Sequence, residues 1–188
     1  MQKAPLFRLT LFLLLASALF SPAAAETVDL TILHINDFHG NLLPKPGKEG
    51  KPATGGMARI AKMVAEEREK NPKGTILLSA GDMFQGTPIS NLFRGRPVIE
   101  TMNRMGFDAM TVGNHEFDWG MEAFQDLRKA ASFPFLSANI LDERGALLPG
   151  VKPYILIRKK GLKIAVIGIT TPETHYATKP ENLKGFRV

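Results

Sequence analysis

The sequence contains no cysteine, and this absence excludes several classes of site at once. A chain without cysteine has no disulfide framework, no thiolate metal site and no cysteine that could carry a lipid anchor. Tryptophan and tyrosine are scarce as well, with one and two residues, although phenylalanine occurs twelve times. A length of 188 residues is nevertheless enough for one domain with a substantial hydrophobic core.

Long apolar runs are also missing, apart from one near the N-terminus. Residues 9–20 form an apolar run of 12 residues, which is too short to span a bilayer comfortably. Two basic residues precede this run, and Ala23-Ala24-Ala25 offers a small-residue cleavage site. We therefore expect residues 1–25 to be a secretory signal peptide, and the mature protein to be periplasmic or secreted, without a stable membrane anchor. A buried N-terminal helix is the alternative.

Basic residues exceed acidic residues only mildly. The net charge is +6 over the whole chain, and two of the basic residues belong to the expected signal peptide. The remaining excess is too small to indicate binding to nucleic acid. Four basic residues cluster within residues 158–163, where a hairpin turn is expected, and we interpret this cluster as a solvated turn.

Apolar runs and helical patterns alternate along the rest of the chain. Short apolar runs predict strands at residues 28–35, 75–79, 108–112 and 133–139. Helical spacing of apolar residues predicts helices at residues 55–70, from Pro97 onward, and at 120–131. Two further runs, 154–158 and 163–169, predict a hairpin, whereas residues 170–188 show no clear period. This alternation predicts a layered α/β domain.

Three of the predicted strands run directly into polar segments. The first is followed by Asn36-Asp37-Phe38-His39-Gly40, the second by Ala80-Gly81-Asp82, and the third by Gly113 to Gly120, with the sequence GNHEFDWG. In open α/β sheets, ligands bind at the carboxyl ends of the strands. Because carboxylate, imidazole and amide groups are concentrated at these ends, we predict that the three segments form a metal site.

The spacing of these groups suggests how they would hold two ions. Asp37 and His39 lie two residues apart in a loop, so their side chains can converge on one ion. Asp82 can bridge two ions with its two oxygens, and Asn114 offers a neutral oxygen. Such ligands favour zinc or manganese, with magnesium, cobalt, iron or calcium as alternatives. Two divalent ions about 3.5–4 Å apart would clamp a phosphoryl group and acidify a bound water.

The third polar segment also offers groups for proton transfer. His115 can lie beyond the ions and protonate the leaving oxygen, or stabilise charge on the phosphoryl oxygens. Asp118, three residues further on, can hold the other nitrogen of that imidazole. Structural alternatives remain, with Asp37 and Asp82 as turn residues and Asp118 as a helix cap. For Glu116, a role at the end of the following helix is the preferred interpretation.

The three polar segments, extended by residues 83–88, resemble the N-terminal motifs of calcineurin-like metallophosphoesterases. Residues 55–61 and 168–174 further resemble the secreted bacterial 5′-nucleotidase family, which includes UDP-sugar hydrolases and 2′,3′-cyclic-nucleotide phosphodiesterases. The resemblance covers the chain from about Val28 to its end. It implies a four-layer α/β/β/α sandwich, followed by a separate C-terminal domain that binds the nucleoside.

The resemblance also implies a reaction and a role for each site residue. The residues that match the family's ligands for two divalent metal ions are Asp37, His39, Asp82 and Asn114. His115 and Asp118 match its catalytic dyad. The implied reaction releases phosphate from exported nucleotides by in-line attack of metal-activated water. The alternatives are the same site acting on UDP-sugars or cyclic nucleotides, and an inactive truncated metal-binding module.

The chain departs from the family pattern because it stops early. Family members carry further histidines downstream, in Gly-His and Gly-His-x-His motifs that complete both metal sites. Here the histidines are His34, His39, His115 and His175. We interpret His34, within an apolar strand, as packed, and His175 as a loop residue. We expect residues 26–188 to be the N-terminal part of a metallophosphoesterase domain whose C-terminal part and nucleoside-binding domain are absent from this chain.

Overall fold

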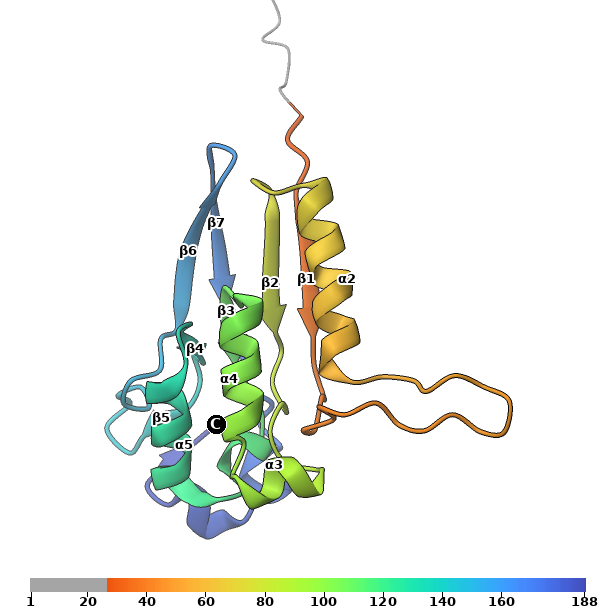
Figure 1. Ribbon diagram of the computed structural model, residues 1–188. Coiled ribbons are helices and arrows are strands. Elements are labelled where there is room, and N and C mark those ends of the chain that lie inside the picture. The colour runs from red at the N-terminus through yellow and green to blue at the C-terminus, as the bar shows by residue number, and fades with distance from the viewer. Residues whose placement is uncertain (1–26) are drawn as a thin grey trace, which may run out of the picture.

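The computed structural model describes residues 27–188, so the predicted signal peptide lies outside the described residues. The centre of the fold is a parallel sheet with the strand order β1-β2-β3-β4. Its strands are β1 (Thr31–Ile35), β2 (Thr75–Ser79), β3 (Ala109–Thr111) and β4 (Phe135–Leu136). Because these strands run in the same direction, their carboxyl ends meet at one edge, which is the lower edge in Figure 1.

Helices cover one face of this sheet (Figure 1). They are α2 (Met57–Lys70), the short α3 (Pro88–Leu92), α4 (Arg96–Met105) and α5 (Gly120–Ala130). α4 shows why such helices form here, because its buried residues Val98, Ile99, Met102 and Met105 repeat at helical spacing. Pro97 lies in its first turn, and Gly106 ends it in a left-handed conformation with φ 66°.

The hydrophobic core lies between the helices and the sheet and reaches the candidate site. Phe117 and Phe124 are fully buried, and their rings stack with centroids 4.8 Å apart. Phe124 also packs against Phe135 of β4, at 5.8 Å. Aromatic pairs of this kind add about 0.5–1.5 kcal/mol to the burial of their area. Since Phe117 belongs to the short 3-10 helix η1 (His115–Phe117), the core fixes the position of the third polar segment.

The rest of the chain forms two smaller strand pairs and a short helical segment. β6 (Tyr154–Lys159) and β7 (Leu162–Ile167) form the antiparallel hairpin that the sequence predicted. β5 (Leu141–Asp142) pairs with β8 (Phe186–Arg187). α6 (Thr174–Ala177) and η2 (Pro180–Leu183) lie in the segment for which the sequence showed no period.

The predicted α/β class and parallel sheet are confirmed, and the bounds of β2 match the prediction. The four-layer sandwich is matched only in part. Residues 27–188 show one helical layer, the parallel sheet and the β6–β7 hairpin, without a second layer of helices in this described part. The predicted fourth strand, 133–139, is shorter in the structure, and the described helices include none long and apolar enough to cross a membrane.

The interpretation of His34 as a packed histidine is wrong. β1 lies at the edge of the sheet, and its side chains alternate between partly buried and exposed positions. Ile32 and His34 occupy the exposed positions, and 57% of Ile32 is accessible to solvent. An apolar strand sequence therefore does not imply burial on both faces when helices cover only one of them.

Candidate metal centre

The loops that follow β1 and β2 run side by side at the carboxyl edge of the sheet. The backbone N–H of Asp37 donates to the carbonyl of Gly81 at 3.1 Å, and the N–H of His39 donates to the carbonyl of Asp82 at 3.0 Å. A third bond, from Gly40 N–H to the carbonyl of Met83 at 2.9 Å, continues the series. The pairing of the two strands thus extends into both polar segments and brings their side chains together.

The loop after β3 approaches the loop after β2 so closely that glycine is needed on both sides. A Cβ atom on Gly113 would clash with the carboxylate of Asp82 and would lie 2.8 Å from Oε2 of Glu116. A Cβ atom on Gly81 would lie 2.7 Å from the nitrogen of Gly113, and Gly81 has a φ of +100°. All three polar segments therefore meet at one place, as the sequence predicted for consecutive parallel strands.

The imidazole of His39 is oriented by a backbone carbonyl. Its Nδ1 lies 2.8 Å from the carbonyl oxygen of Gln85. A carbonyl oxygen can only accept, so Nδ1 carries the proton and Nε2 keeps its lone pair. A hydrogen bond of this kind on the distal ring nitrogen is typical of histidines that bind metals. Gln85 was not among the predicted site residues, because a backbone carbonyl leaves no signal in the sequence.

Three potential ligand groups converge in the space between the loops. One ring nitrogen each from His39 and His115 and one carboxylate oxygen of Asp82 lie within 4.8 Å of one another. Oδ1 of Asp82 accepts the backbone N–H of His115 at 3.0 Å. Two imidazole nitrogens with a carboxylate oxygen fit a zinc-like or manganese-like ion by ligand type. The donor set present in this chain therefore fits a divalent metal.

The structure places the other two predicted ligands beside this group rather than within it. The side chain of Asp37 is 62% exposed, and its Oδ1 lies 3.9 Å from Nε2 of His39. Asn36 donates a hydrogen bond from its amide to the second oxygen of Asp37. The side chain of Asn114 donates from Nδ2 to the carbonyl of Ala177 at 3.5 Å, which leaves its oxygen for a ligand role. The ligand roles of both residues stay predictions.

His115 and Asp118 form the contact that the sequence predicted. Nδ1 of His115 lies 2.6 Å from Oδ2 of Asp118. Oδ1 of Asp118 accepts a hydrogen bond from the hydroxyl of Thr178 at 3.1 Å, and its backbone carbonyl accepts one from Nδ2 of Asn182 at 3.2 Å. α5 begins without a side-chain cap, so Asp118 does not serve as its cap. The catalytic role of the pair stays a prediction.

The surroundings of His115 favour its protonated form. Burial lowers the pKa of the imidazole, but the hydrogen bond and the negative charge of Asp118 raise it. The carboxylates of Asp82 and Glu116 raise it further, and the net effect is a pKa above the usual value of 6.5. A histidine that holds its proton near neutral pH is suited to donate it to a leaving oxygen.

The assignment of Glu116 to a helix end is wrong. Glu116 is only 1% exposed, and α5 begins without a side-chain cap. The carboxylate accepts the backbone N–H groups of Asp82 at 2.9 Å, Met83 at 2.9 Å and Gly113 at 2.7 Å. Burial and the neighbouring Asp82 raise the pKa of Glu116 to about 7, although the three N–H donors favour the ionised form. The short sequence distance from Glu116 to α5 could not reveal these hydrogen bonds, because two of the three donors lie over 30 residues away in the sequence.

An open cleft of about 690 Å³ lies on one side of the dyad. It is lined by Gln85, His115, Asp118, Trp119 and residues 176–180. Its volume is within the usual range of small-molecule sites, about 300–1,000 Å³. The cleft therefore borders both His115 and Asp118.

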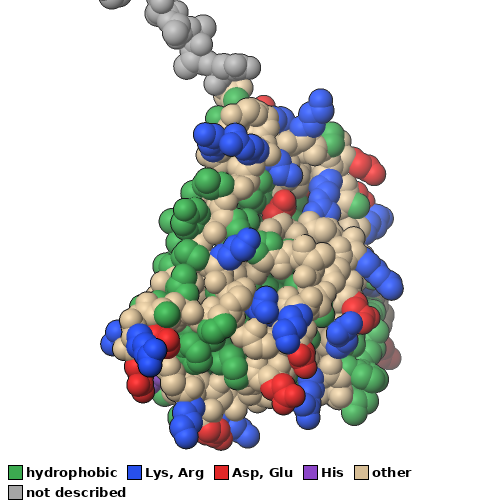
Figure 2. Space-filling view, turned by 90° about the vertical axis from the view of Figure 1, so that its left-hand side faces the viewer, with side chains coloured by type: hydrophobic (Ala, Val, Ile, Leu, Met, Phe, Trp, Pro, Cys, Tyr) green, Lys and Arg blue, Asp and Glu red, His purple; other side chains and the backbone are tan. Residues whose placement is uncertain are grey.

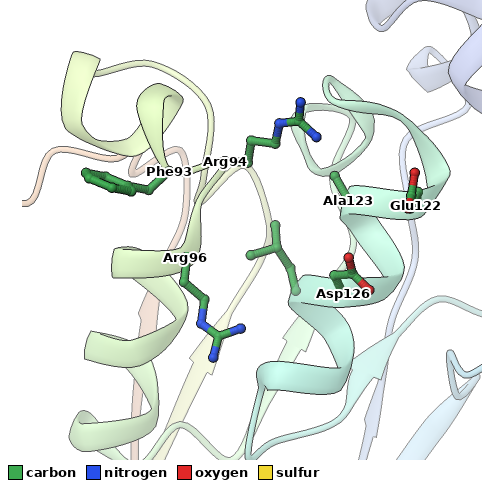
Figure 3. Close-up of a pocket in the computed structure, with 7 residues that line it drawn as sticks. Phe93, Arg94, Arg96, Glu122, Ala123 and Asp126 are labelled. Carbon is green, nitrogen blue, oxygen red and sulfur yellow. The ribbon is translucent and has the colours of Figure 1, made fainter.

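A second cavity, of about 270 Å³, lies between the start of α4 and α5 (Figure 3). Arg94 and Arg96 line it on one side, and Glu122 and Asp126 on the other. Its lining includes none of the predicted site residues, so it is separate from the candidate centre.

Comparison with known proteins shows the family to which this chain belongs. A profile described as calcineurin-like phosphoesterase matches residues 30–183. The chain belongs to the calcineurin-like phosphoesterase family. A snake venom 5′-nucleotidase from Crotalus adamanteus is 41% identical over 173 residues. The 5′-nucleotidase of Vibrio cholerae is 38% identical over 164 residues. Each match covers 87% of this chain and 29% of the relative.

Solved structures agree with this phosphoesterase fold over part of their length. The structure of Haemophilus influenzae NAD nucleotidase is similar with a TM-score of 0.73 at 35% identity. That match covers 85% of this chain and 29% of the other. The chain thus spans about a third or less of the length of these relatives. Metallophosphoesterases use divalent metals, and His39, Asp82 and His115 form a candidate group for one here.

Proposed function

We propose that this chain carries the metal-binding and proton-transferring part of a 5′-nucleotidase-type phosphoesterase, which releases phosphate from exported nucleotides. The observation that supports this most strongly is the convergence of His39, Asp82 and His115, with His115 held by Asp118. It occurs at the carboxyl edge of a parallel sheet, in a chain that the phosphoesterase profile matches over residues 30–183.

In this proposal the ligands and the dyad have separate tasks. His39, Asp82 and Asp37 would hold one ion, and Asp82 and Asn114 would contribute to a second. Divalent ions at this position supply charge neutralisation at the phosphoryl oxygens and a lowered pKa for an attacking water. His115, protonated through its contact with Asp118, donates its proton to the leaving oxygen.

The proposed substrate is a nucleotide or nucleotide sugar whose leaving group occupies the cleft beside His115. Trp119 and Tyr176 present aromatic surfaces there, and Lys179 presents a positive charge. The same site acting on UDP-sugars or cyclic nucleotides is the alternative within this reaction class. An inactive metal-binding module is the alternative outside it.

We also propose that the protein is exported and that this chain is the N-terminal part of a larger protein. The composition of residues 1–25, with a basic start, an apolar run and small residues before Glu26, supports a signal peptide. Residues 26–188 then form the N-terminal part of a metallophosphoesterase domain. Mass spectrometry of protein secreted from a bacterial host tests the first point, because cleavage after Ala25 leaves Glu26 as the first residue.

The test of the proposed function is metal-dependent release of phosphate from AMP and UDP-glucose by the protein encoded by the complete gene. We expect activity that EDTA abolishes and that manganese or zinc restores. The Asp82→Asn variant, which loses a charged ligand oxygen, should remain inactive after metal is added back. Activity that survives both EDTA and Asp82→Asn would contradict the proposal.

A further inference from the structure

We propose that Glu116 is the positioning residue that fixes Asp82 and His115 relative to each other, and thereby sets the affinity of the centre for a divalent ion. This inference rests on the metal site proposed above. Glu116 is buried, is not expected to touch an ion or a substrate, and plays no part in capping α5. Its side chain instead connects the two loops that carry the candidate ligands.

The connection consists of three hydrogen bonds from one carboxylate. Oε2 accepts the N–H of Asp82 at 2.9 Å and the N–H of Gly113 at 2.7 Å, so a single oxygen joins the loop after β2 to the loop after β3. Oε1 accepts the N–H of Met83 at 2.9 Å. Hydrogen bonds to an ionised carboxylate are shorter and stronger than those between neutral groups.

A further hydrogen bond runs between the same loops in the opposite direction. Oδ1 of Asp82 accepts the backbone N–H of His115 at 3.0 Å. Asp82 itself has a φ of 54°, in the left-handed region that residues other than glycine seldom adopt. The Glu116 bonds to the N–H groups of Asp82 and Met83 hold the backbone on both sides of this strained position. They therefore determine where the Asp82 carboxylate points.

A buried carboxylate at this place needs a reason, because Asp82 adds a second negative charge beside it. Burying a charge is unfavourable unless hydrogen bonds or counter-charges compensate for it. Three backbone N–H donors supply that compensation, and they come from both loops.

Two conservative variants separate geometry from charge. Glu116→Gln removes the charge but keeps one oxygen, which can still accept from both Asp82 and Gly113, while its amide nitrogen cannot accept from Met83. Glu116→Asp keeps the charge but is one methylene shorter, so it cannot hold both loops at the same separation. If Glu116 acts by position, the Asp variant should bind metal more weakly than the Gln variant. If it acts only by charge, the order should be the reverse.

The experiment is a Co²⁺ titration of the protein encoded by the complete gene, followed by calorimetry and by the visible absorption of the bound ion. We expect Glu116→Ala and Glu116→Asp to weaken Co²⁺ binding by ~10–100-fold, the usual effect of removing an outer-shell partner. Glu116→Gln should lose less than Glu116→Asp. The control is Ser137→Ala, which removes a fully buried hydroxyl bonded to Thr170 and Asn139 outside the centre. It should lower thermal stability without changing Co²⁺ affinity or absorption.

The outcomes distinguish failure of the positioning role of Glu116 from failure of the proposed metal site. Should Glu116→Ala fail to fold, the Asp and Gln variants still give the ordering. Wild-type affinity in Glu116→Asp, an equal loss in Ser137→Ala, or weaker binding by Gln than by Asp would overturn the positioning role while leaving the metal site intact. Absence of Co²⁺ binding by the wild-type protein encoded by the complete gene would overturn the proposed metal site, and the role of Glu116 with it.

Discussion

His115 lies beside the candidate metal ligands His39 and Asp82 and also contacts Asp118. Whether its imidazole binds an ion or donates a proton determines the mechanism. Its ring meets that of His39 edge-on, with centroids 4.8 Å apart, while Nδ1 is held by Asp118. Nε2 is therefore the atom that would face either an ion or a leaving oxygen. The family resemblance favours the leaving oxygen, whereas the close grouping with His39 and Asp82 also allows a ligand role.

Replacement of His115 by alanine distinguishes these two roles. In the protein encoded by the complete gene, we expect His115→Ala to lower turnover by ~10²–10⁴-fold, the usual contribution of a positioned acid or base. Metal content should hardly change, because the proposed ligands remain. Asp118→Asn should act in the same direction but by less, since the imidazole is still present. Metal analysis by mass spectrometry decides the point, and a site emptied by His115→Ala would make this histidine a ligand.

The protonation of His115 offers a second test that requires no turnover. Burial lowers the pKa of this imidazole, but the hydrogen bond and charge of Asp118, together with the charges of Asp82 and Glu116, raise it above its usual value. Asp118→Asn should therefore lower the pKa of His115 in the metal-free chain. Because the folded-state pKa is raised above 6.5, the protonated ring stabilises the fold at low pH, and this contribution is lost as the pH rises through the raised value. NMR titration with EDTA present measures the shift, and an unchanged or higher pKa would contradict this account.

At the scale of elements, the β6–β7 hairpin leaves one apolar face in solvent. Tyr154, Leu156 and Ile167 are each more than half exposed, and Tyr154 lies directly across from Ile167. Figure 2 faces this side of the molecule and shows hydrophobic side chains in a band along one margin, below a group of basic side chains. Large exposed apolar patches promote association when nothing covers them.

We expect the chain to self-associate through this face. Leu156→Thr with Ile167→Thr should reduce association while keeping the hairpin, because threonine is β-branched and suits a strand. Ile157→Thr, on the opposite and partly buried face, is the matched control and should instead destabilise the fold by roughly 0.5–3 kcal/mol. Light scattering and thermal unfolding measure the two effects. Equal association by the double variant and the wild type would show that the face is not responsible.

Elements with local signals were predictable from the sequence, and elements held by distant contacts were not. β2 was predicted with its observed bounds because an uninterrupted run from Thr75 to Ser79 is bounded by glycines. α6, η2 and β8 were missed because they are short and carry no period. They are stabilised instead by contacts such as Thr178 and Asn182 with Asp118, which lies 60 or more residues away in the sequence.

In the candidate site, too, features with local sequence signals were predictable and features that depend on distant contacts were not. The motif residues and the contact between His115 and Asp118 were predictable, because the groups follow strand ends and lie three residues apart. The roles of Glu116 and of the Gln85 carbonyl were not, since both depend on how loops from different strands meet. The exposure of His34 likewise depends on which face of the sheet the helices cover.

For the whole molecule, we expect residues 26–188 alone to bind at most one metal ion weakly and to show no nucleotidase activity above background. A two-metal reaction needs both ions fixed, and the second ion has only Asp82 and Asn114 as proposed ligands in this chain. The measurement is metal stoichiometry together with phosphate release from AMP, beside the protein encoded by the complete gene. Two tightly held ions, or turnover close to that of the complete protein, would contradict the expectation.

The central claim is that the strand ends of this sheet form a metal centre, and anomalous diffraction from crystals grown with zinc tests it most directly. The account predicts an anomalous peak at bonding distance, about 2.0–2.2 Å, from Nε2 of His39 and from a carboxylate oxygen of Asp82. Nδ1 of His115 should remain on Asp118. A map with no peak between His39 and Asp82, or with zinc only at the exposed His34 or His175, would contradict the account.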